Sequence, residues 1–362
     1  MIWEVFLCEV FMANAVLSAL AETMTKEALP LIIKWYRENR RMLPWREDPS
    51  PYHCWIAEIM LQQTRIEAVI PYYRRFLLEL PDIAALAAVQ EDRLLKLWEG
   101  LGYYSRARNL KRAAEILMEK HAGSLPASFP ELRKLPGIGD YTAGALSSIA
   151  FGLPEPAVDG NVLRVFMRLL ACDEDITALS LKRNVTALLR SQYPEGESAA
   201  LLTEGLMELG ETVCLPNAAP RCVQCPLYSV CQAHLVGEEL LYPFIPPKKP
   251  RRIDEKTVLL MYCRGRYAIR KRTEKGLLCG LWEFPNMNGK LSPEEIRSLL
   301  QPEELLFCGS SRHVFTHVEW LMTGYRLVLK EEIPGYIWRT PEEIRRDYSL
   351  PTAFRFYQNQ LD

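Results

Sequence analysis

The sequence predicts two domains, an all-α body followed by a smaller α+β domain. From about residue 26 to 236, apolar residues recur three and four positions apart between short Pro or Gly breaks, as in amphipathic helices. Residues 237–256 contain four prolines and a basic run, which is typical of a linker. We therefore expect a helical domain over 24–236 and a second domain over 257–362.

The second domain is expected to alternate strands with a few helices. Two strand-like runs flank a Gly turn within residues 256–272, and GLWEFP (280–285) and residues 311–330 indicate further strands. PEEIRSLL (293–300) and the last twenty residues have helical patterns instead. At 362 residues and 49% hydrophobic content, the chain can bury a core in each domain.

The first 23 residues form an N-terminal extension of doubtful status. They are apolar but contain Glu4, Glu9 and Glu22 and no Lys or Arg, unlike a signal peptide or membrane anchor. We expect these residues to form an extra helix or to precede the true start of the protein, because Met24 is a natural initiator methionine. We expect no membrane partner.

Charge and cysteine content narrow the function classes. Lys and Arg number 44 against 45 Asp and Glu, so any nucleic-acid binding must use local basic patches rather than a global charge. Ten cysteines without an export signal favour a reducing compartment. We therefore expect a cytoplasmic protein, which we also take to be a monomer, and any association with nucleic acid must depend on local basic patches.

Four cysteines are clustered in one run. Cys214, Cys222, Cys225 and Cys231 are separated by seven, two and five residues. Short gaps of this kind bring thiolates to one compact inorganic centre, either a [4Fe-4S] cluster or a structural zinc ion. The spacing alone does not distinguish the two.

LPGIGDYTAGALSSIAFG, residues 135–152, predicts a hairpin between two helices, within about 128–152. Gly137 and Gly139 permit a tight turn whose backbone N–H groups can meet a DNA phosphate beside a helix N-terminus. A plain helical connection is the alternative. Further phosphate contacts could come from nearby basic side chains, namely Arg106, Arg108, Lys111, Arg112, Arg133 and Lys134.

Asp159 directly precedes an apolar helical pattern in VDGNVLRVFMRLL. Its ordinary role there is a helix N-cap, and its functional role would be a carboxylate held over positive charge developing on a sugar. The two roles are compatible.

The chain contains the hairpin, then Asp159, then the cysteine run. This order resembles the endonuclease III superfamily of DNA glycosylases, whose cluster is [4Fe-4S]. The resemblance implies that 214–231 form an iron-sulfur cluster loop. Many relatives have six residues in the first cysteine gap, so the seven here imply a slight bulge. In the lyase branch, a lysine that forms a Schiff base occupies the place of Tyr141. The resemblance thus favours a monofunctional glycosylase over a bifunctional glycosylase/AP lyase.

Glu58 is the single carboxylate in the apolar stretch 55–61, where a partly protonated acid could donate a proton to a leaving base. The neighbouring strings LPWRE, LQQT and GLGYYSRARNL resemble the MutY family of adenine DNA glycosylases, which act in base excision repair. That family removes adenine mispaired with 8-oxoguanine, and the resemblance covers about residues 26–358.

The resemblance also implies roles for individual residues. Glu58 would protonate adenine at N7 and Asp159 would stabilise the oxocarbenium-like sugar, assisted by Tyr141 and Asn161. The pocket for adenine would be lined by Leu43, Trp45, Arg46 and Glu208. Gln63 and Tyr103 would enter the duplex once adenine has left the stack.

The second domain resembles the Nudix fold, and the family uses it to check the opposite base. Phe315, Thr316 and His317 match the string that recognises 8-oxoguanine, with Thr316 where serine is common. The Glu-rich helix that holds metal in Nudix hydrolases is missing after residue 285, so we expect recognition without hydrolysis.

The implied partner is double-stranded DNA that contains A:8-oxoguanine or A:G mispairs. Besides the lyase, two rivals are a non-catalytic DNA-binding or redox module and a Nudix-type hydrolase. The joint presence of Glu58 and Asp159 favours chemistry over simple binding.

Overall fold

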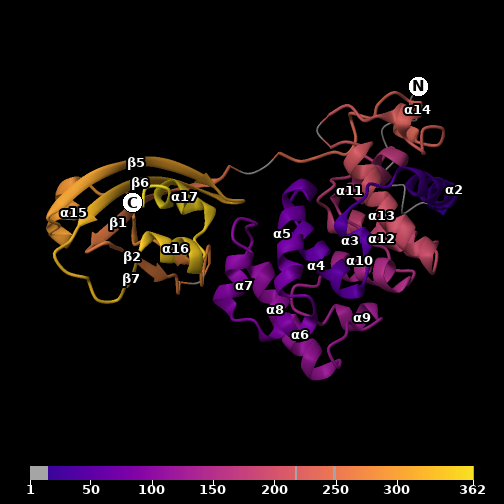
Figure 1. The fold of residues 1–362 in the computed structure, drawn as a ribbon. Coiled ribbons are helices and arrows are strands. Elements are labelled where there is room, and N and C mark those ends of the chain that lie inside the picture. The colour runs from indigo at the N-terminus through magenta and orange to yellow at the C-terminus, as the bar shows by residue number, and fades with distance from the viewer. Residues whose placement is uncertain (1–14, 217, 248–249, 275, 362) are drawn as a thin grey trace. The chain divides into compact units, whose positions relative to one another are not determined.

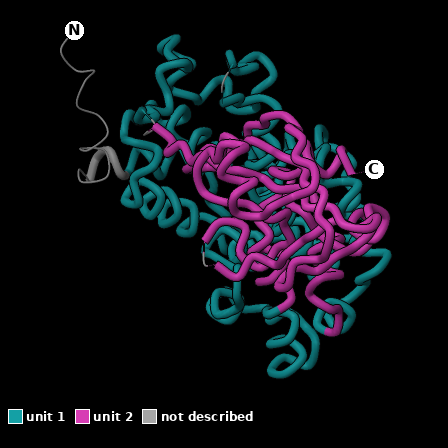
Figure 2. The backbone as a smooth tube through the Cα atoms, turned by 90° about the vertical axis from the view of Figure 1, so that its left-hand side faces the viewer, with its two compact units in different colours: residues 1–87, 112–247 teal, residues 88–111, 248–362 magenta. Residues whose placement is uncertain are grey.

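A computed structural model describes residues 15–216, 218–247, 250–274 and 276–361. Contacts divide the chain into two compact units, coloured separately in Figure 2. The first comprises residues up to Ala87 together with Arg112–Pro247, and the second comprises Ala88–Lys111 with Lys248–Asp362. This division groups one helical segment, residues 88–111, with the C-terminal residues.

The first unit is helical, as predicted (Figure 1). Its helices are α2 (Ala15–Asn39), α3 (Pro44–Glu47), α4 (Pro51–Leu61), α5 (Ile66–Glu79), α6 (Ile83–Ala88), α9 (Phe129–Leu132), α10 (Asp140–Ala145), α11 (Gly160–Leu169), α12 (Leu179–Arg190), α13 (Glu197–Thr212) and α14 (Gln232–Leu235), with a π-helical turn η1 (Leu146–Ala150) and a 3-10 turn η2 (Cys222–Gln224). Two further helices, α7 (Glu91–Leu97) and α8 (Ser105–Lys120), lie in or run into the second unit.

Local sequence explains where the helices that carry the site begin. Ser50 caps α4 by accepting a hydrogen bond from the backbone N–H of His53, and Pro51 follows at the first helical position. Helices α2, α11, α12 and α13 then bury their apolar sides in one core around fully buried Ile32 and Phe166. Because α4 and α13 are anchored in this way, the side chains that they present hold fixed positions.

The second unit contains a mixed sheet ordered β3-β2-β1-β6-β5, with β4 paired to β1 and β7 to β2. Its strands are β1 (Arg252–Cys263), β2 (Arg266–Lys271), β3 (Trp282–Glu283), β4 (Asn286–Asn288), β5 (Glu304–Val314), β6 (Val318–Val328) and β7 (Ile337–Arg339), and its C-terminal helical elements are α15 (Pro293–Leu300), α16 (Pro341–Asp347), η3 (Thr352–Phe354) and α17 (Arg355–Gln358). Strands β1 and β6 are parallel, and the other pairs are antiparallel. The predicted strands and helices of an α+β domain are therefore confirmed.

The predicted linker, 237–256, is more ordered than its composition indicates. Strand β1 begins at Arg252, because its parallel ladder with β6 extends to the pair Arg252–Val318. Upstream, Ile176 donates its backbone N–H to the carbonyl of Phe244 (3.2 Å), so this part of the linker packs on the helical unit. The last five residues of the predicted linker, 252–256, therefore belong to a strand instead.

The N-terminal extension lies partly outside the described residues, because residues 1–14 are not among them. Helix α2 runs without a break through Met24, and Ala21 and Met24 are both buried in the core. In the described part of the chain, no helix has the length and apolar character that crossing a membrane requires.

Candidate active site

Glu58 lies on α4 with only 6% of its surface exposed. Its Oε2 atom accepts no hydrogen bond from the described residues. Burial raises the pKa of this carboxyl from 4.5 to about 7; the Tyr141 hydroxyl partly opposes the shift, and the negative charges of Glu204 and Asp159 add to it. At neutral pH a large fraction of the Glu58 carboxyl therefore carries a proton.

A cavity opens beside Glu58. Its lining includes Leu43, Trp45, Arg46 and Glu208, so the structure brings together all four residues predicted for the adenine pocket. Apolar walls come from further residues, including Ala57, Leu61, Ile66, Ile149 and Met207. An enclosed apolar cavity with a few fixed polar groups is the usual form of a small-ligand site.

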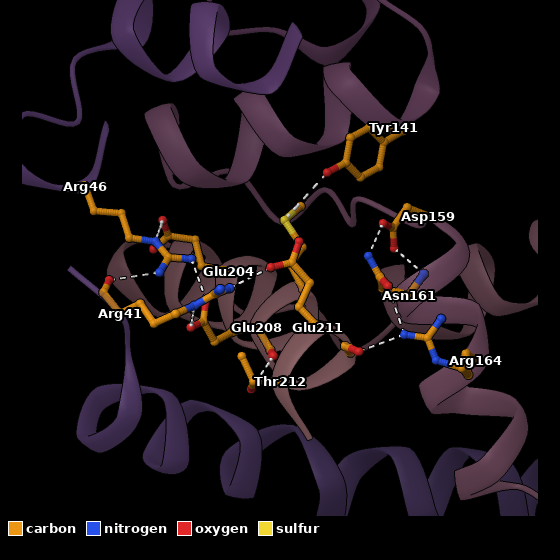
Figure 3. Close-up of polar contacts among 12 residues, drawn as sticks. Arg41, Arg46, Tyr141, Asp159, Asn161, Arg164, Glu204, Glu208, Glu211 and Thr212 are labelled. Atoms are coloured by element: carbon orange, nitrogen blue, oxygen red, sulfur yellow. Dashed lines mark hydrogen bonds and ion pairs between the residues drawn. The ribbon is translucent and has the colours of Figure 1, made fainter. Parts of the chain in front are cut away.

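Ion pairs fix the polar wall of the cavity (Figure 3). Arg46 donates from Nε to Glu204 Oε1 (3.2 Å) and from Nη2 to Glu208 Oε2 (3.0 Å). Arg41 pairs with Glu208 as well, and its Nη2 donates to Glu211 Oε2 (2.6 Å). Since Glu208 is only 2% exposed, both arginines compensate its buried charge.

Three of these residues were missed by the sequence reasoning, namely Arg41, Glu204 and Glu211. Acids at positions 204, 208 and 211 share one face of α13, and this spacing of four and three was the available signal. No sequence signal identifies Arg41, because it contacts α13 only in the tertiary fold.

Asp159 is the N-cap of α11, as predicted. Its Oδ1 accepts the backbone N–H groups of Asn161 and Val162, and its Oδ2 accepts Asn161 Nδ2, each at 2.9 Å. Asn161 in turn accepts from Arg164 Nη2 (2.9 Å) and packs against Gly210, where a Cβ would lie 2.6 Å from Asn161 Cβ. Both carboxylate oxygens of Asp159 are thus held in one orientation (Figure 3).

Tyr141 lies on α10, directly after the hairpin turn. Its hydroxyl donates to Met207 Sδ (3.6 Å), and burial raises the pKa of that hydroxyl well above 10. Three residues along, Gly144 allows α10 to approach the carbonyl of Pro156, which a Cβ would meet at 2.3 Å. Tyr141 is therefore fixed as a neutral phenol close to Glu58.

The hairpin turn itself is exposed at Gly137 and Gly139. Gly137 has a φ of +80°, which favours glycine, whereas Gly139 caps α10 in an extended conformation that other residues adopt. Arg133 pairs with Asp140 across the turn (2.5 Å). A phosphate contact at this turn stays a prediction.

Gln63 and Tyr103, the predicted wedge residues, share an unusual backbone conformation. Both are exposed and have positive φ, 56° and 46°. Such a conformation costs a non-glycine residue about 1–3 kcal/mol and is concentrated at functional positions. Each side chain thus projects from its own unit at a strained point.

Arg106 is not a surface phosphate contact, contrary to the expectation from its motif. It is 7% exposed, and its Nη2 donates to the carbonyls of Leu101 (3.2 Å) and Gly102 (3.1 Å). Its guanidinium lies 5.6 Å from the centre of the Tyr103 ring. It therefore holds the loop that presents Tyr103, and burial lowers its pKa to about 10.

Phe315, Thr316 and His317 form the turn between β5 and β6. Phe315 packs edge-on against buried Trp320, with ring centres 5.0 Å apart, while Thr316 and His317 are exposed. Within the second unit, Thr316 Oγ1 lies 2.9 Å from the Tyr103 hydroxyl. The predicted recognition string and one predicted wedge are therefore adjacent.

All four predicted metal ligands line one cavity: Cys214, Cys222, Cys225 and Cys231. Burial raises the pKa of the Cys222 thiol to about 11 and that of the Cys225 thiol to about 12. Four converging sulfurs in an apolar enclosure fit a metal–thiolate centre, whose binding would displace these protons.

The sequence reasoning overlooked two residues beside this cavity. Ligand atoms of Cys222, His234 and Glu239 lie within 4.8 Å of one another, a set that would suit zinc. His234 Nδ1 contacts the carboxylate of Glu239. The geometry therefore fits both an iron-sulfur cluster and a zinc ion, and metal analysis distinguishes the two.

Comparisons with known proteins agree with this site. Residues 56–191 match the HhH-GPD superfamily base excision DNA repair protein model, and residues 257–359 match a NUDIX domain model. The adenine DNA glycosylase of Homo sapiens is 30% identical over 91% of this chain and 73% of its own length. That of Buchnera aphidicola subsp. Schizaphis graminum is 35% identical over 73% of this chain and 76% of its own.

A solved structure resembles the helical part. A trapped covalent complex of endonuclease III with DNA is 26% identical with a TM-score of 0.50, covering 60% of this chain and 98% of its own. The two adenine DNA glycosylases, matched at 30% and 35% identity over most of this chain, show that the chain belongs to the adenine DNA glycosylase family.

Proposed function

We propose that this enzyme, a DNA glycosylase of base excision repair, hydrolyses the N-glycosidic bond of adenine mispaired with 8-oxoguanine, or with guanine, in duplex DNA. The observation that carries the proposal is Glu58, a buried carboxyl with a pKa of about 7 that lines the same cavity as Trp45 and Arg46. A general acid works best when its pKa lies near the working pH.

The chemistry follows from four residues, of which Glu58 and Asp159 act directly. The Glu58 carboxyl donates its proton to N7 of adenine, the bond from C1′ to N9 breaks, and its electron pair stays with the base. Positive charge on the sugar is then stabilised by the fixed carboxylate of Asp159, with Asn161 and Tyr141 beside it. Water then adds to C1′ and gives up a proton, which returns to the Glu58 carboxylate, so the acid is restored and hydrolysis is complete.

The ion-paired wall gives the pocket its selectivity. Arg46 offers donors and Glu204 and Glu208 offer acceptors, in positions that their ion pairs fix before adenine arrives. Adenine carries ring acceptors and an exocyclic donor, so it can satisfy both kinds of group.

The remaining assignments extend the same proposal. Gln63 and Tyr103 fill the space that adenine leaves, and Phe315, Thr316 and His317 contact 8-oxoguanine. The Gly137 and Gly139 turn binds the DNA backbone. We propose domains over 24–236 and 257–362, and a monomer that acts in the cytoplasm.

For the cysteines we propose a [4Fe-4S] cluster held by Cys214, Cys222, Cys225 and Cys231. It would supply a structural centre that orders the loop between α13 and α14. Glu58 and Asp159, rather than the cluster, carry the proposed base removal.

Tyr141 separates the proposal from the lyase alternative. A Schiff base needs an amine, and Tyr141 is a neutral phenol at the place where the lyase branch has lysine. We expect no borohydride-trapped adduct between this enzyme and DNA.

Single-turnover release of adenine tests the proposal. Duplexes with adenine opposite 8-oxoguanine, guanine or thymine should lose adenine at rates that decrease in that order. Glu58→Gln should bind the first duplex but fail to release adenine, and Glu67→Gln, which changes an exposed acid on α5, should act like wild type. Normal release by Glu58→Gln would contradict the assigned acid.

A further inference from the structure

Arg168 is buried between the cysteine cavity and the chain that follows it. Only 4% of the residue is exposed, on α11. Its Nε donates to the carbonyls of Glu239 (3.0 Å) and Tyr242 (2.9 Å), and its Nη1 donates to the carbonyl of Leu215 (3.0 Å) and to Cys214 Sγ (3.2 Å). One guanidinium thus joins the first cysteine to the segment after the last.

The backbone of Arg168 reaches the other end of the cysteine run. Its carbonyl accepts from Cys231 Sγ at 3.3 Å. The side chain and the main chain of one residue therefore contact both the first and the fourth of the predicted ligands, which are separated by sixteen residues of sequence.

Charge balance at this place requires an anion. A buried guanidinium costs several kcal/mol unless a negative group compensates it. Within the described residues Arg168 makes no ion pair with a carboxylate, and its partners are carbonyls and a thiol. Arg164, one turn earlier and 6% exposed, likewise donates to carbonyls and an amide. Four thiolates around a metal centre carry net negative charge and would supply the missing compensation.

We infer that Arg168 is a positioning residue of the metal centre, which holds Cys214 as a thiolate ligand and sets the reduction potential through its N–H to sulfur contact. The inference rests on the cluster proposed above. Hydrogen bonds and positive charge at a ligating sulfur stabilise the reduced form, so their loss lowers the potential.

Three variants test this role. Arg168→Gln removes the charge, Arg168→Lys keeps the charge but loses the planar fork, and Arg221→Gln removes an exposed charge from the same loop. The readouts are iron per chain, the midpoint potential by voltammetry, and the rate of iron loss to a chelator after ferricyanide.

We expect Arg168→Gln to have a lower potential and to lose iron about tenfold faster or more, as for other residues that support metal ligands. Arg168→Lys should lie between it and wild type, and Arg221→Gln should match wild type. If Arg168→Gln does not fold, Arg168→Lys decides: an unchanged potential and rate of iron loss overturn the inference. Wild type without iron would overturn the cluster and the inference together, whereas iron-loaded wild type with unchanged Arg168 variants overturns the inference alone.

Discussion

The titration of Glu58 makes a quantitative prediction about stability. Its folded pKa of about 7 exceeds the 4.5 of an ordinary glutamate, because burial disfavours the charged form. The folded state therefore favours the protonated form of Glu58. The stability that this protonation gives the folded state is fully present below about pH 4.5 and is lost as pH rises through about 7.

The size of this effect follows from the shift. A rise in pKa from 4.5 to about 7 corresponds to about 3 kcal/mol, since one pKa unit is about 1.4 kcal/mol. Most of that, about 2–3 kcal/mol, should be lost between about pH 5 and pH 8. Glu58→Gln cannot ionise, so its free energy of unfolding should rise by this amount relative to wild type over the same range.

The assay is urea unfolding of wild type, Glu58→Gln and the exposed control Glu67→Gln at both pH values. The control should keep a constant difference from wild type. A stability difference between wild type and Glu58→Gln that does not change with pH would refute the reasoning. The rate of adenine release by wild type should also fall about tenfold per unit above pH 7, as the acid loses its proton.

Two further predictions concern other residues. Asp159→Asn should stop adenine release. It should lower the free energy of unfolding by less than about 1 kcal/mol, because asparagine caps helices as well as aspartate does. Adenine release near the wild-type rate would contradict the role of Asp159 in stabilising the sugar cation. Gly324→Ala should destabilise the second unit by about 1–3 kcal/mol, because a Cβ there would lie 2.1 Å from the Tyr357 ring. A loss below about 0.5 kcal/mol in thermal unfolding would contradict the packing argument.

Features that depend on local sequence could be predicted. The hairpin follows from Gly137, the cap of α11 follows from Asp159, and the turn between β1 and β2 follows from Gly265, which has a positive φ. Each signal lies within a few residues of the structure that it produces. The resemblance to a family added the pocket residues, which no local pattern identifies.

Features that depend on contacts between residues far apart in sequence could not be predicted. Arg41 and Glu211 are 170 positions apart, and only the packing of α13 with α2 brings them together. Arg106 looks like a surface base in sequence, but the carbonyls of its own loop draw it inside. The first part of the predicted linker is ordered by the buried Arg168, which no composition rule detects.

The most direct test of the account is adenine release under single-turnover conditions from a duplex with adenine opposite 8-oxoguanine. Wild type should release adenine and leave an intact abasic strand, without a borohydride-trapped adduct, and Glu58→Gln should bind the same duplex and release none. Release by Glu58→Gln at the wild-type rate, or a trapped adduct with wild type, would contradict the account.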